Sequence, residues 1–399
     1  MKKWTAIMTA LLLLCCIDAY ADSEYESLYK LAEPYGFKLG SCLSYNQMRD
    51  QNYLNLLKTH FNSVTMTNET KAYSMLDENA SRKTTDGMPV INYKIADDMV
   101  GWAQKNGLGV RGHVLVWDAY MCDWYFHEDF DSRKPYADQE TIQKRTEYYI
   151  QQVITHFEEK FPGVVYCWDV VNEAVADAAG EYDPADPTHL RTKRGSADNL
   201  FLKYMGEDYV AQAFLYARNT VEALGADIEL YYNDYNMYFP EKVQAALKLM
   251  EKVNTFSKDE NGNDRKLVDG IGMQGYIGGY GTQQGCLEPS HLDLIKNAIQ
   301  TYEKNGLKVQ ITEMAVRNFE KDQAEKHAAY YADLFGVFKS LYADGANPLN
   351  AVIIWGLTDY PNVPKGNYVY NLNSPYGGLV DEKLNYKDAF CAVYEELLK

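Results

Sequence analysis

The sequence predicts a single (β/α)8 TIM barrel. Short apolar runs rich in β-branched residues alternate with longer helical patterns along most of the 399 residues. Eight β-then-α units in one chain of this length indicate a closed parallel barrel. A doubly wound sheet would also alternate, but it should carry a glycine-rich phosphate-binding turn after its first strand. This chain has KLGSC (38–42) there instead.

The elements follow in chain order. In the stretch 322–342, apolar residues recur at intervals of three and four, as in an amphipathic helix. The charged insert 257–266 precedes a strand, which predicts a solvated hairpin on the barrel's bottom face. The predicted strands are residues 36–43, 62–66, 109–117, 164–172, 228–233, 270–276, 308–312 and 351–357. The predicted helices include 141–157, 207–224, 241–253, 291–305 and 322–342.

Residues 1–21 are typical of a secretory signal peptide and not of the fold. Two lysines precede an apolar core too short to span a bilayer, and AYA (19–21) gives a small-x-small cleavage site. We therefore expect an exported protein, secreted or periplasmic, with one folded domain over residues 22–399. Lipidation of Cys15 or Cys16, which would anchor the protein at the outer surface, is the alternative.

Composition limits the partners. The formal net charge of −17 disfavours nucleic acid and anionic lipid and suits a neutral substrate. No later stretch predicts a membrane span. The scattered histidines show no H-x-H or H-E-x-x-H, so we expect no metal and no cofactor. We also expect a monomer. The odd number and wide spacing of the remaining cysteines disfavour a disulfide framework, although one pair stays open; they are Cys42, Cys122, Cys167, Cys286 and Cys391.

Two predicted strands end in a glutamate, in YCWDVVNE (166–173) and VQITE (309–313). The carboxyl ends of barrel strands share one face, where such barrels bind their substrates. Glycoside hydrolysis needs paired carboxylates, one to protonate the leaving oxygen and one to attack or to activate water. A single glutamate after an apolar run is usually a helix cap or a rim charge. The prediction therefore depends on Glu173 and Glu313 together.

Other strand ends carry amides, one lysine, one histidine and flat aromatic rings. Fixed donors and acceptors hold hydroxyl groups, and sugar rings stack on aromatic faces, so this set predicts a site for a neutral polyol. Taken singly, His113 would more often be structural, and the tryptophans would be core residues. The glycine run 275–281 is either a loop that admits a ligand or a plain turn. The candidate binding residues are Asn68, Lys71, His113, Trp117, Asn172, Gln274, Tyr276 and Trp355.

From residue 35 to the last helix, the chain resembles glycoside hydrolase family 10, the endo-1,4-β-xylanases. The resemblance implies a catalytic domain over residues 22–399. It also implies that Glu173 is the general acid/base and Glu313 the nucleophile of a retaining double displacement. The segments that carry it, in family order, are FNSVTMTNETK (61–71), VRGHVLVW (110–117), WDVVNE (168–173), YNDYN (232–236), GIGMQ (270–274), ITE (311–313) and WGLTD (355–359).

The resemblance further implies how the substrate is held. Asn172 would bind the 2-hydroxyl of the sugar at the cleaved bond. Lys71 and His113 would contact the 3-hydroxyl side of that sugar, and Asn68 would reach the next sugar out. These are implied roles, and the residue pattern alone leaves them open.

Three further residues receive roles in the same way. Gln274 would orient the nucleophile, and Trp117 and Trp355 would form part of the platform for sugar rings. Family members usually carry Glu and Gln where this chain has Thr67 and Tyr120. The contacts with outer sugars are therefore expected to differ from the family pattern.

The chain also departs from the family close to the nucleophile. Tyr276 replaces the usual His, and Ala315 replaces an Asp two residues after Glu313. Asp118 stands where a histidine usually follows the tryptophan, and a second tryptophan expected near residues 360–364 is absent. Tyr276 can still offer a hydroxyl to Glu313, so we expect a divergent and slower member with Tyr276 as the surviving support.

The leading prediction is a secreted retaining endo-1,4-β-xylanase that hydrolyses internal linkages of xylan or xylo-oligosaccharides. The alternatives are a retaining β-glycosidase on decorated xylan or another β-1,4 glycan, and a catalytically weak carbohydrate-binding barrel. For the leading prediction, the two carboxyl groups should lie about 5–5.5 Å apart. The pKa of Glu173 should be raised by the ionised nucleophile.

Overall fold

The computed structural model describes residues 25–277, 288–360 and 374–399, and in these residues eight parallel strands form a closed barrel. Neighbours in the chain pair in order around the ring, and β10 with β12 and β13 with β1 complete it. The predicted TIM barrel is confirmed. The barrel strands are β1 (Lys38–Leu43), β2 (Ser63–Met66), β5 (Gly109–Gly112), β6 (Val165–Asn172), β9 (Glu229–Asp234), β10 (Gly270–Met273), β12 (Lys308–Val316) and β13 (Leu349–Ile354).

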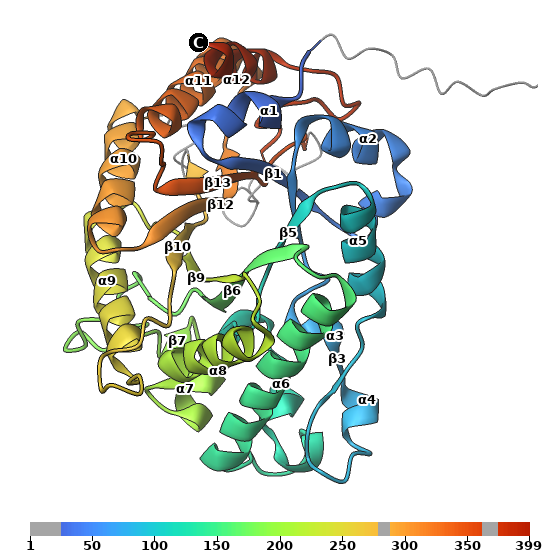
Figure 1. Cartoon of the computed structure of the whole chain (residues 1–399), viewed down its shortest axis with the longest axis vertical. Coiled ribbons are helices and arrows are strands. Elements are labelled where there is room, and N and C mark those ends of the chain that lie inside the picture. Colours follow the sequence, from blue (N-terminus) through green and yellow to red (C-terminus); the bar gives the residue numbers. More distant parts are fainter. Residues whose placement is uncertain (1–24, 278–287, 361–373) are drawn as a thin grey trace, which may run out of the picture.

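Helices surround the strands (Figure 1). The first of them, α1 (Leu28–Ala32), contacts the last, α12 (Asp388–Leu398), so the two ends of the described chain pack together. The other long helices are α2 (Gln51–His60), α5 (Lys94–Lys105), α6 (Gln139–Lys160), α8 (Tyr209–Leu224), α9 (Pro240–Thr255), α10 (Pro289–Lys304) and α11 (Ala324–Ser340). The short elements are α3 (Ala72–Met75), β3 (Leu76–Asp77), α4 (Glu78–Ser81), β4 (Val90–Ile91), β7 (Lys193–Arg194), β8 (Ala197–Asp198), α7 (Leu200–Met205) and β11 (Tyr276–Ile277).

Four predicted strands end at clearly different residues in the structure. The sixth was expected to reach residue 276 and the eighth residue 357, but β10 ends at Met273 and β13 at Ile354. The third was expected to reach residue 117, but β5 ends at Gly112. Beyond it the chain still follows β6, because the backbone N–H groups of Leu115 and Val116 donate to carbonyls of that strand. The seventh was expected to end at residue 312, but β12 continues to Val316 because β11 pairs with its second half.

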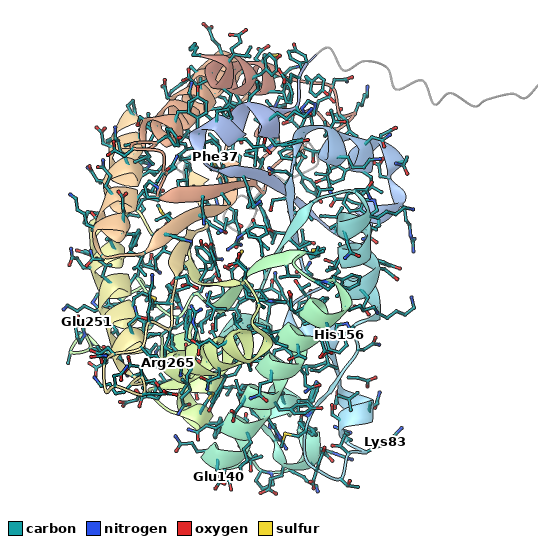
Figure 2. All side chains as sticks on the ribbon, viewed as in Figure 1. Phe37, Lys83, Glu140, His156, Glu251 and Arg265 are labelled. Atoms are coloured by element: carbon teal, nitrogen blue, oxygen red, sulfur yellow. The ribbon has the colours of Figure 1, made fainter. Side chains whose placement is uncertain are left out.

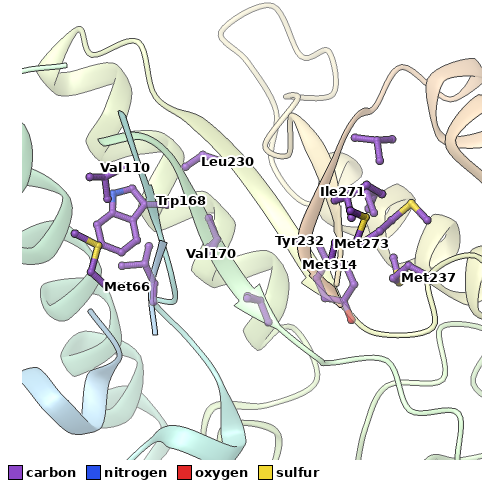
Figure 3. Close-up of a cluster of buried hydrophobic side chains, with 14 of the residues drawn as sticks. Met66, Val110, Trp168, Val170, Leu230, Tyr232, Met237, Ile271, Met273 and Met314 are labelled. Atoms are coloured by element: carbon purple, nitrogen blue, oxygen red, sulfur yellow. The ribbon is translucent and has the colours of Figure 1, made fainter. Parts of the chain in front are cut away.

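Side chains of the barrel strands alternate between the barrel interior and the helix layer. Trp168 of β6 is fully buried and packs on Phe157 of α6, with ring centroids 5.9 Å apart. Figure 3 shows its ring beside Val110 and Met66. A Cβ atom at position 112 would come within 2.3 Å of the Trp168 ring, so only glycine fits there. The Trp168 ring thus requires glycine at the neighbouring position of β5.

Charged side chains lie at the periphery of the molecule. Figure 2 shows Lys83, Glu140 and Glu251 at the periphery, and all three are exposed. The insert between α9 and β10 forms a hairpin, as the sequence predicts. Lys258 pairs with Asp264 across this hairpin. In the described part of the chain, no helix has the length and apolar character needed to cross a membrane.

Candidate active site

The two predicted glutamates lie toward the carboxyl-terminal ends of β6 and β12. Glu173 directly follows β6, and Glu313 lies inside β12. Glu173 adopts a positive φ of 54°, which is uncommon for a residue other than glycine and turns the chain out of the strand. Its backbone N–H donates to the Asn233 carbonyl at 2.9 Å, and that of Glu313 donates to the Gln274 carbonyl at 2.9 Å. Each glutamate is therefore fixed by the neighbouring strand.

One polar cluster joins the two carboxylates. The Gln274 amide donates to Glu173 Oε1 at 2.9 Å and to Asn172 Oδ1 at 3.4 Å. The Asn233 amide donates to the same Asn172 oxygen at 2.9 Å and to Glu313 Oε1 at 3.2 Å. The prediction that the Gln274 side chain orients Glu313 is therefore wrong. Its side chain binds Glu173, and only its backbone carbonyl contacts Glu313.

The second oxygen of Glu313 accepts a hydrogen bond from the Tyr276 hydroxyl, as the sequence predicts. Tyr276 is 5% exposed and pairs in register with Ala315, so β11 holds it beside the carboxylate. The Thr312 hydroxyl donates to Asn233 Oδ1 at 2.6 Å, which directs the Asn233 amide nitrogen toward Glu313. Both Glu313 oxygens therefore have a fixed neutral donor.

The pKa of Glu173 is raised, in the predicted direction but for a different main reason. Burial is the largest cause, and the nearby carboxylate that adds most is Asp234, where the sequence predicted Glu313. The Arg194 guanidinium opposes both effects, because it lies 2.9 Å from Glu173 Oε2. A buried carboxyl group with a raised pKa is suited to donate a proton near neutral pH.

Sequence reasoning missed three charged residues at this end of the barrel, namely Arg191, Arg194 and Lys242. Arg191 donates from Nε to the Glu173 carbonyl at 3.0 Å, and Arg194 pairs with the carboxylate itself. Asp234 lies 3.1 Å from the buried ammonium group of Lys242. Asp234 lies in the segment YNDYN (232–236) at the end of the fifth predicted strand, so the sequence already placed it at this end of the barrel. Nothing in the local pattern marks the arginines or the lysine.

Lys71 lies within the field of both glutamates. Its ammonium group donates to Asn68 Oδ1 at 3.1 Å and lies over the rings of Trp117 and Tyr120, at 5.0 and 4.5 Å from their centroids. Burial lowers its pKa, and the charges of Glu313 and Glu173 act against that shift. The structure thus brings Asn68, Lys71 and Trp117 together, as predicted.

The buried ion pair between Arg111 and Asp169 holds His113 in place inside the barrel. Its Nδ1 lies 2.8 Å from Asp169 Oδ2. Arg111 holds the same carboxylate with two hydrogen bonds, of 2.5 and 3.0 Å. In a neutral ring that donates from Nδ1, Nε2 is an acceptor, which suits a sugar hydroxyl. The ring lies between Trp117 and Trp355, with centroids 6.0 and 6.3 Å away.

Two buried donors of this face have no acceptor among the described residues, namely Asn172 Nδ2 and Trp117 Nε1. Such groups are costly unless they find a partner. Aromatic rings also lead away from the site, because Tyr120 lies 4.4 Å from Trp117 and Tyr73 lies 5.3 Å from Tyr120, measured between centroids. Both tyrosines are exposed, at 39% and 40%. This combination fits a polyol chain that leaves the site along aromatic faces.

Some predictions fall on residues that the structure does not describe. These are the signal peptide, most of the glycine run 275–281, Cys286 and most of the segment 360–364. Within the described ranges, Cys42, Cys122, Cys167 and Cys391 are unpaired. In the same ranges, no three or more His, Cys, Asp or Glu side chains are arranged to hold a metal ion.

Comparison with known proteins places this geometry in context. The model of glycosyl hydrolase family 10 matches residues 27–396. A putative endo-1,4-beta-xylanase of Caldicellulosiruptor saccharolyticus is 32% identical over 76% of this chain and 92% of its own length. Endo-1,4-beta-xylanase B of Butyrivibrio fibrisolvens is 28% identical over 90% of this chain, which spans about half of that relative (52%).

Solved structures share the fold. The CBM22-1–GH10 modules of a Clostridium thermocellum endo-1,4-beta-D-xylanase, complexed with xylohexaose, match with a TM-score of 0.76 and 25% identity. That match covers 92% of this chain and 67% of the other. An intracellular xylanase from Thermoanaerobacterium saccharolyticum matches with a TM-score of 0.71 and 27% identity, over 93% of this chain and 99% of its own.

Proposed function

Because the chain belongs to glycosyl hydrolase family 10, we propose that it is a retaining endo-1,4-β-xylanase that cleaves internal linkages of xylan. The observation that carries the proposal is the pair of glutamates, from β6 and β12, joined by one polar cluster. Relatives named as xylanases, and a neighbour complexed with xylohexaose, support the choice of a β-1,4-linked xylose polymer.

In the first half of the proposed reaction, the Glu313 carboxylate attacks the anomeric carbon and forms a glycosyl ester. The bond from that carbon to the glycosidic oxygen breaks, and Glu173 gives its proton to the leaving oxygen. The raised pKa of Glu173 supports this role as acid. The neutral donors Tyr276 and Asn233 leave the negative charge of Glu313 available for attack.

In the second half, Glu173 is a carboxylate and removes a proton from water. The water oxygen bonds to the anomeric carbon, and Glu313 leaves as a carboxylate. Two inversions at one carbon give net retention. The unpaired donors on Asn172 and Trp117, with His113 and Lys71, would hold sugar hydroxyls throughout.

We further propose that the protein is exported and monomeric. The basic and apolar pattern of residues 1–21 supports export, although one solved neighbour is described as intracellular. Mass spectrometry of the protein from its native host should give a mature chain that starts at Asp22. A chain that retains residues 1–21, or that carries a lipid at Cys15 or Cys16, would contradict this cleavage. Light scattering should give the mass of one chain.

The test of the activity separates the two glutamates. Glu313→Ala should remove nearly all turnover on every xylose substrate. Glu173→Ala should lose much less on aryl xylosides with good leaving groups than on xylo-oligosaccharides, because an activated leaving group departs without protonation. Glu320→Ala, at an exposed position after β12, is the control and should retain turnover. Proton NMR of the first product should show the β anomer.

If the first product is the α anomer, the enzyme inverts the configuration at the anomeric carbon and the retaining mechanism is wrong. Equal losses in the two alanine variants on activated substrates would overturn the roles of Glu173 and Glu313. Turnover on cellulose-derived but not xylose-derived oligosaccharides would favour another β-1,4 glycan. Saturable binding of xylo-oligosaccharides without turnover would favour a binding barrel.

A further inference from the structure

A hairpin in the long segment after β6 places an arginine on the acid/base glutamate. Arg194 Nη1 lies 2.9 Å from Glu173 Oε2. Its Nη2 and Nε atoms lie 3.0 and 3.3 Å from the two oxygens of Asp118. We propose that Arg194 is a positioning residue that holds Glu173 in its carboxylate form through this ion pair, with Asp118 as the anchor of the arginine. The inference rests on the function proposed above.

The β7–β8 hairpin (residues 193–198) positions this arginine. Arg194 pairs with Ala197 across β7 and β8, and Gly195 takes a φ of 59° in the two-residue turn between them. Glu181 fixes the hairpin from outside, because Oε1 accepts the Gly195 N–H at 2.8 Å and its carbonyl accepts the Thr192 N–H at 2.8 Å. The guanidinium is therefore brought to Glu173 by an ordered backbone.

Both oxygens of Glu173 are occupied in this arrangement. Gln274 donates to Oε1 as a neutral amide, whereas the Arg194 guanidinium forms an ion pair with Oε2. Asp118 takes the two-atom contact, which is the geometry of a strong arginine–carboxylate pair. When Glu173 is protonated, Arg194 loses one charged partner and keeps Asp118. Asp118 is therefore the permanent partner, and Glu173 is the partner that changes during the reaction.

Among the described residues, Arg194 is the one cation in ion-pair contact with the Glu173 carboxylate, and no other charge lowers the pKa of Glu173 as much. Burial and Asp234 raise the pKa of Glu173, and Arg194 lowers it. The arginine therefore favours the carboxylate, which is the base of the second half-reaction, and makes the protonated form a stronger acid. The other charged or titratable groups of the described residues that bear on Glu173 or its partners are Arg191, Asp234 with its counter-ion Lys242, Tyr209, Tyr235, Lys71 and Glu313.

The experiment is a pH profile of kcat/KM on an unactivated xylo-oligosaccharide. Its basic limb reports loss of the acid proton from Glu173. Arg194→Met keeps the length of the side chain and removes its charge, so the limb should move up by about one pH unit or more. Asp118→Asn should move it down, because Glu173 then becomes the sole carboxylate on Arg194. Arg194→Lys should restore most of the parent limb. Lys193→Met, the exposed neighbour, should leave it unchanged.

Activated aryl xylosides provide an internal control. Their first step needs no acid, so the Glu173 limb should be absent from kcat/KM in parent and variants alike. If Arg194→Met changes the rate but not the position of the limb on oligosaccharides, the arginine merely braces the hairpin and the inference is overturned. The same holds if Asp118→Asn and Arg194→Met move the limb in one direction.

A second measurement does not require turnover. Carboxyl groups of ¹³C-labelled glutamate can be titrated by NMR, and the Glu173 signal is assigned by its loss in Glu173→Gln. Its titration midpoint should rise in Arg194→Met. If no xylose substrate is turned over, the proposed function fails and this titration still decides the ion pair. If turnover is normal and the midpoint is unmoved, the inference fails alone.

Discussion

Tyr276 replaces an ionisable group next to Glu313 by a hydroxyl that donates without carrying charge. The structure gives Glu313 two donors, Tyr276 on one oxygen and Asn233 on the other. Ala315 adds no polar contact, since its methyl side chain has none to offer. Among the residues that the structure describes, two side chains thus support the nucleophile, so each should have a large effect when removed.

Replacing Tyr276 by Phe tests this at the scale of one atom. The variant removes the hydroxyl and keeps the buried ring, so packing against β12 is preserved. Losing one donor to such a carboxylate should cost about 1–3 kcal/mol, and turnover should fall about tenfold to a hundredfold. Steady-state kcat on xylo-oligosaccharides measures it, with unchanged thermal unfolding as the control. A kcat within about twofold of the parent would mean that Tyr276 contributes packing only and that the support of Glu313 comes from elsewhere.

The contacts of these residues were only partly predictable. Glu173 and Glu313 could be found because each closes a short apolar strand, and that pattern is local. Gln274 could be placed on the correct face, but not on the correct glutamate. Which carboxylate an amide reaches depends on its rotamer and on Asn172, whose oxygen accepts from both Gln274 and Asn233. That choice arises only after four strands have packed.

At the scale of elements, sequence patterns predicted the regular strands and helices but not the short irregular elements. The β7–β8 hairpin has strands of two residues, too short for any periodic signal. Its position depends on Glu181, more than ten residues earlier in the chain. The extension of β12 to Val316 likewise depends on β11, which is only two residues long. Sequence patterns therefore predict the scaffold better than the segments that complete the site.

The short 3₁₀ turn Asp118–Tyr120 places the Tyr120 ring 4.4 Å from the Trp117 ring, measured between centroids, and we expect Tyr120 to contact a sugar beyond the one at the cleaved bond. Tyr120→Ala should raise KM about fivefold for oligosaccharides long enough to reach it, because one stacking contact contributes about 1 kcal/mol. It should leave kcat nearly unchanged, since binding to a remote sugar is equal in ground and transition states. Short aryl xylosides should be unaffected. Tyr342→Ala, an equally exposed tyrosine on another part of the surface, is the control.

An equal rise in KM for short and long substrates would contradict this assignment. It would mean that Tyr120 acts through Lys71, whose ammonium group lies over its ring, and not through an outer sugar. The ratio of KM values for short and long substrates therefore distinguishes direct stacking from a change inside the site.

On the scale of the whole molecule, two buried histidines connect distant parts of the chain. His60 of α2 is 0% exposed, lies 2.7 Å from the Tyr386 hydroxyl and packs on Phe390 of α12. His327 of α11 is 1% exposed, and its Nε2 donates to the Val316 carbonyl at 2.8 Å. The sequence predicted the closed barrel, because each β–α unit has its own pattern. No local sequence pattern predicts these contacts between elements that are far apart in the chain.

Burial lowers the pKa of both histidines to about 4. In the unfolded chain each would take up a proton near pH 6.5, whereas in the folded protein each stays neutral until about pH 4. Between these values the unfolded state binds more protons, so the free energy of unfolding falls as the pH falls through this window. By pH 4.5, each histidine should lower the free energy of unfolding by about 2–3 kcal/mol. Glu173 and Asp234, whose pKa values are raised, act in the opposite direction.

The variant His327→Gln isolates one of these contributions. Glutamine is neutral at every pH and still has an amide donor for the Val316 carbonyl, so stability at pH 7.5 should change by less than about 1 kcal/mol. Urea unfolding at pH 7.5 and at pH 4.5 should then show a drop that is smaller than in the parent by about 2–3 kcal/mol, the share of one histidine. An identical drop in the two proteins would mean that His327 is protonated in the folded state above pH 4.5. Since Glu173 and Asp234 are present in both proteins, their opposing effect cancels in the comparison, and the difference measures the buried histidine alone.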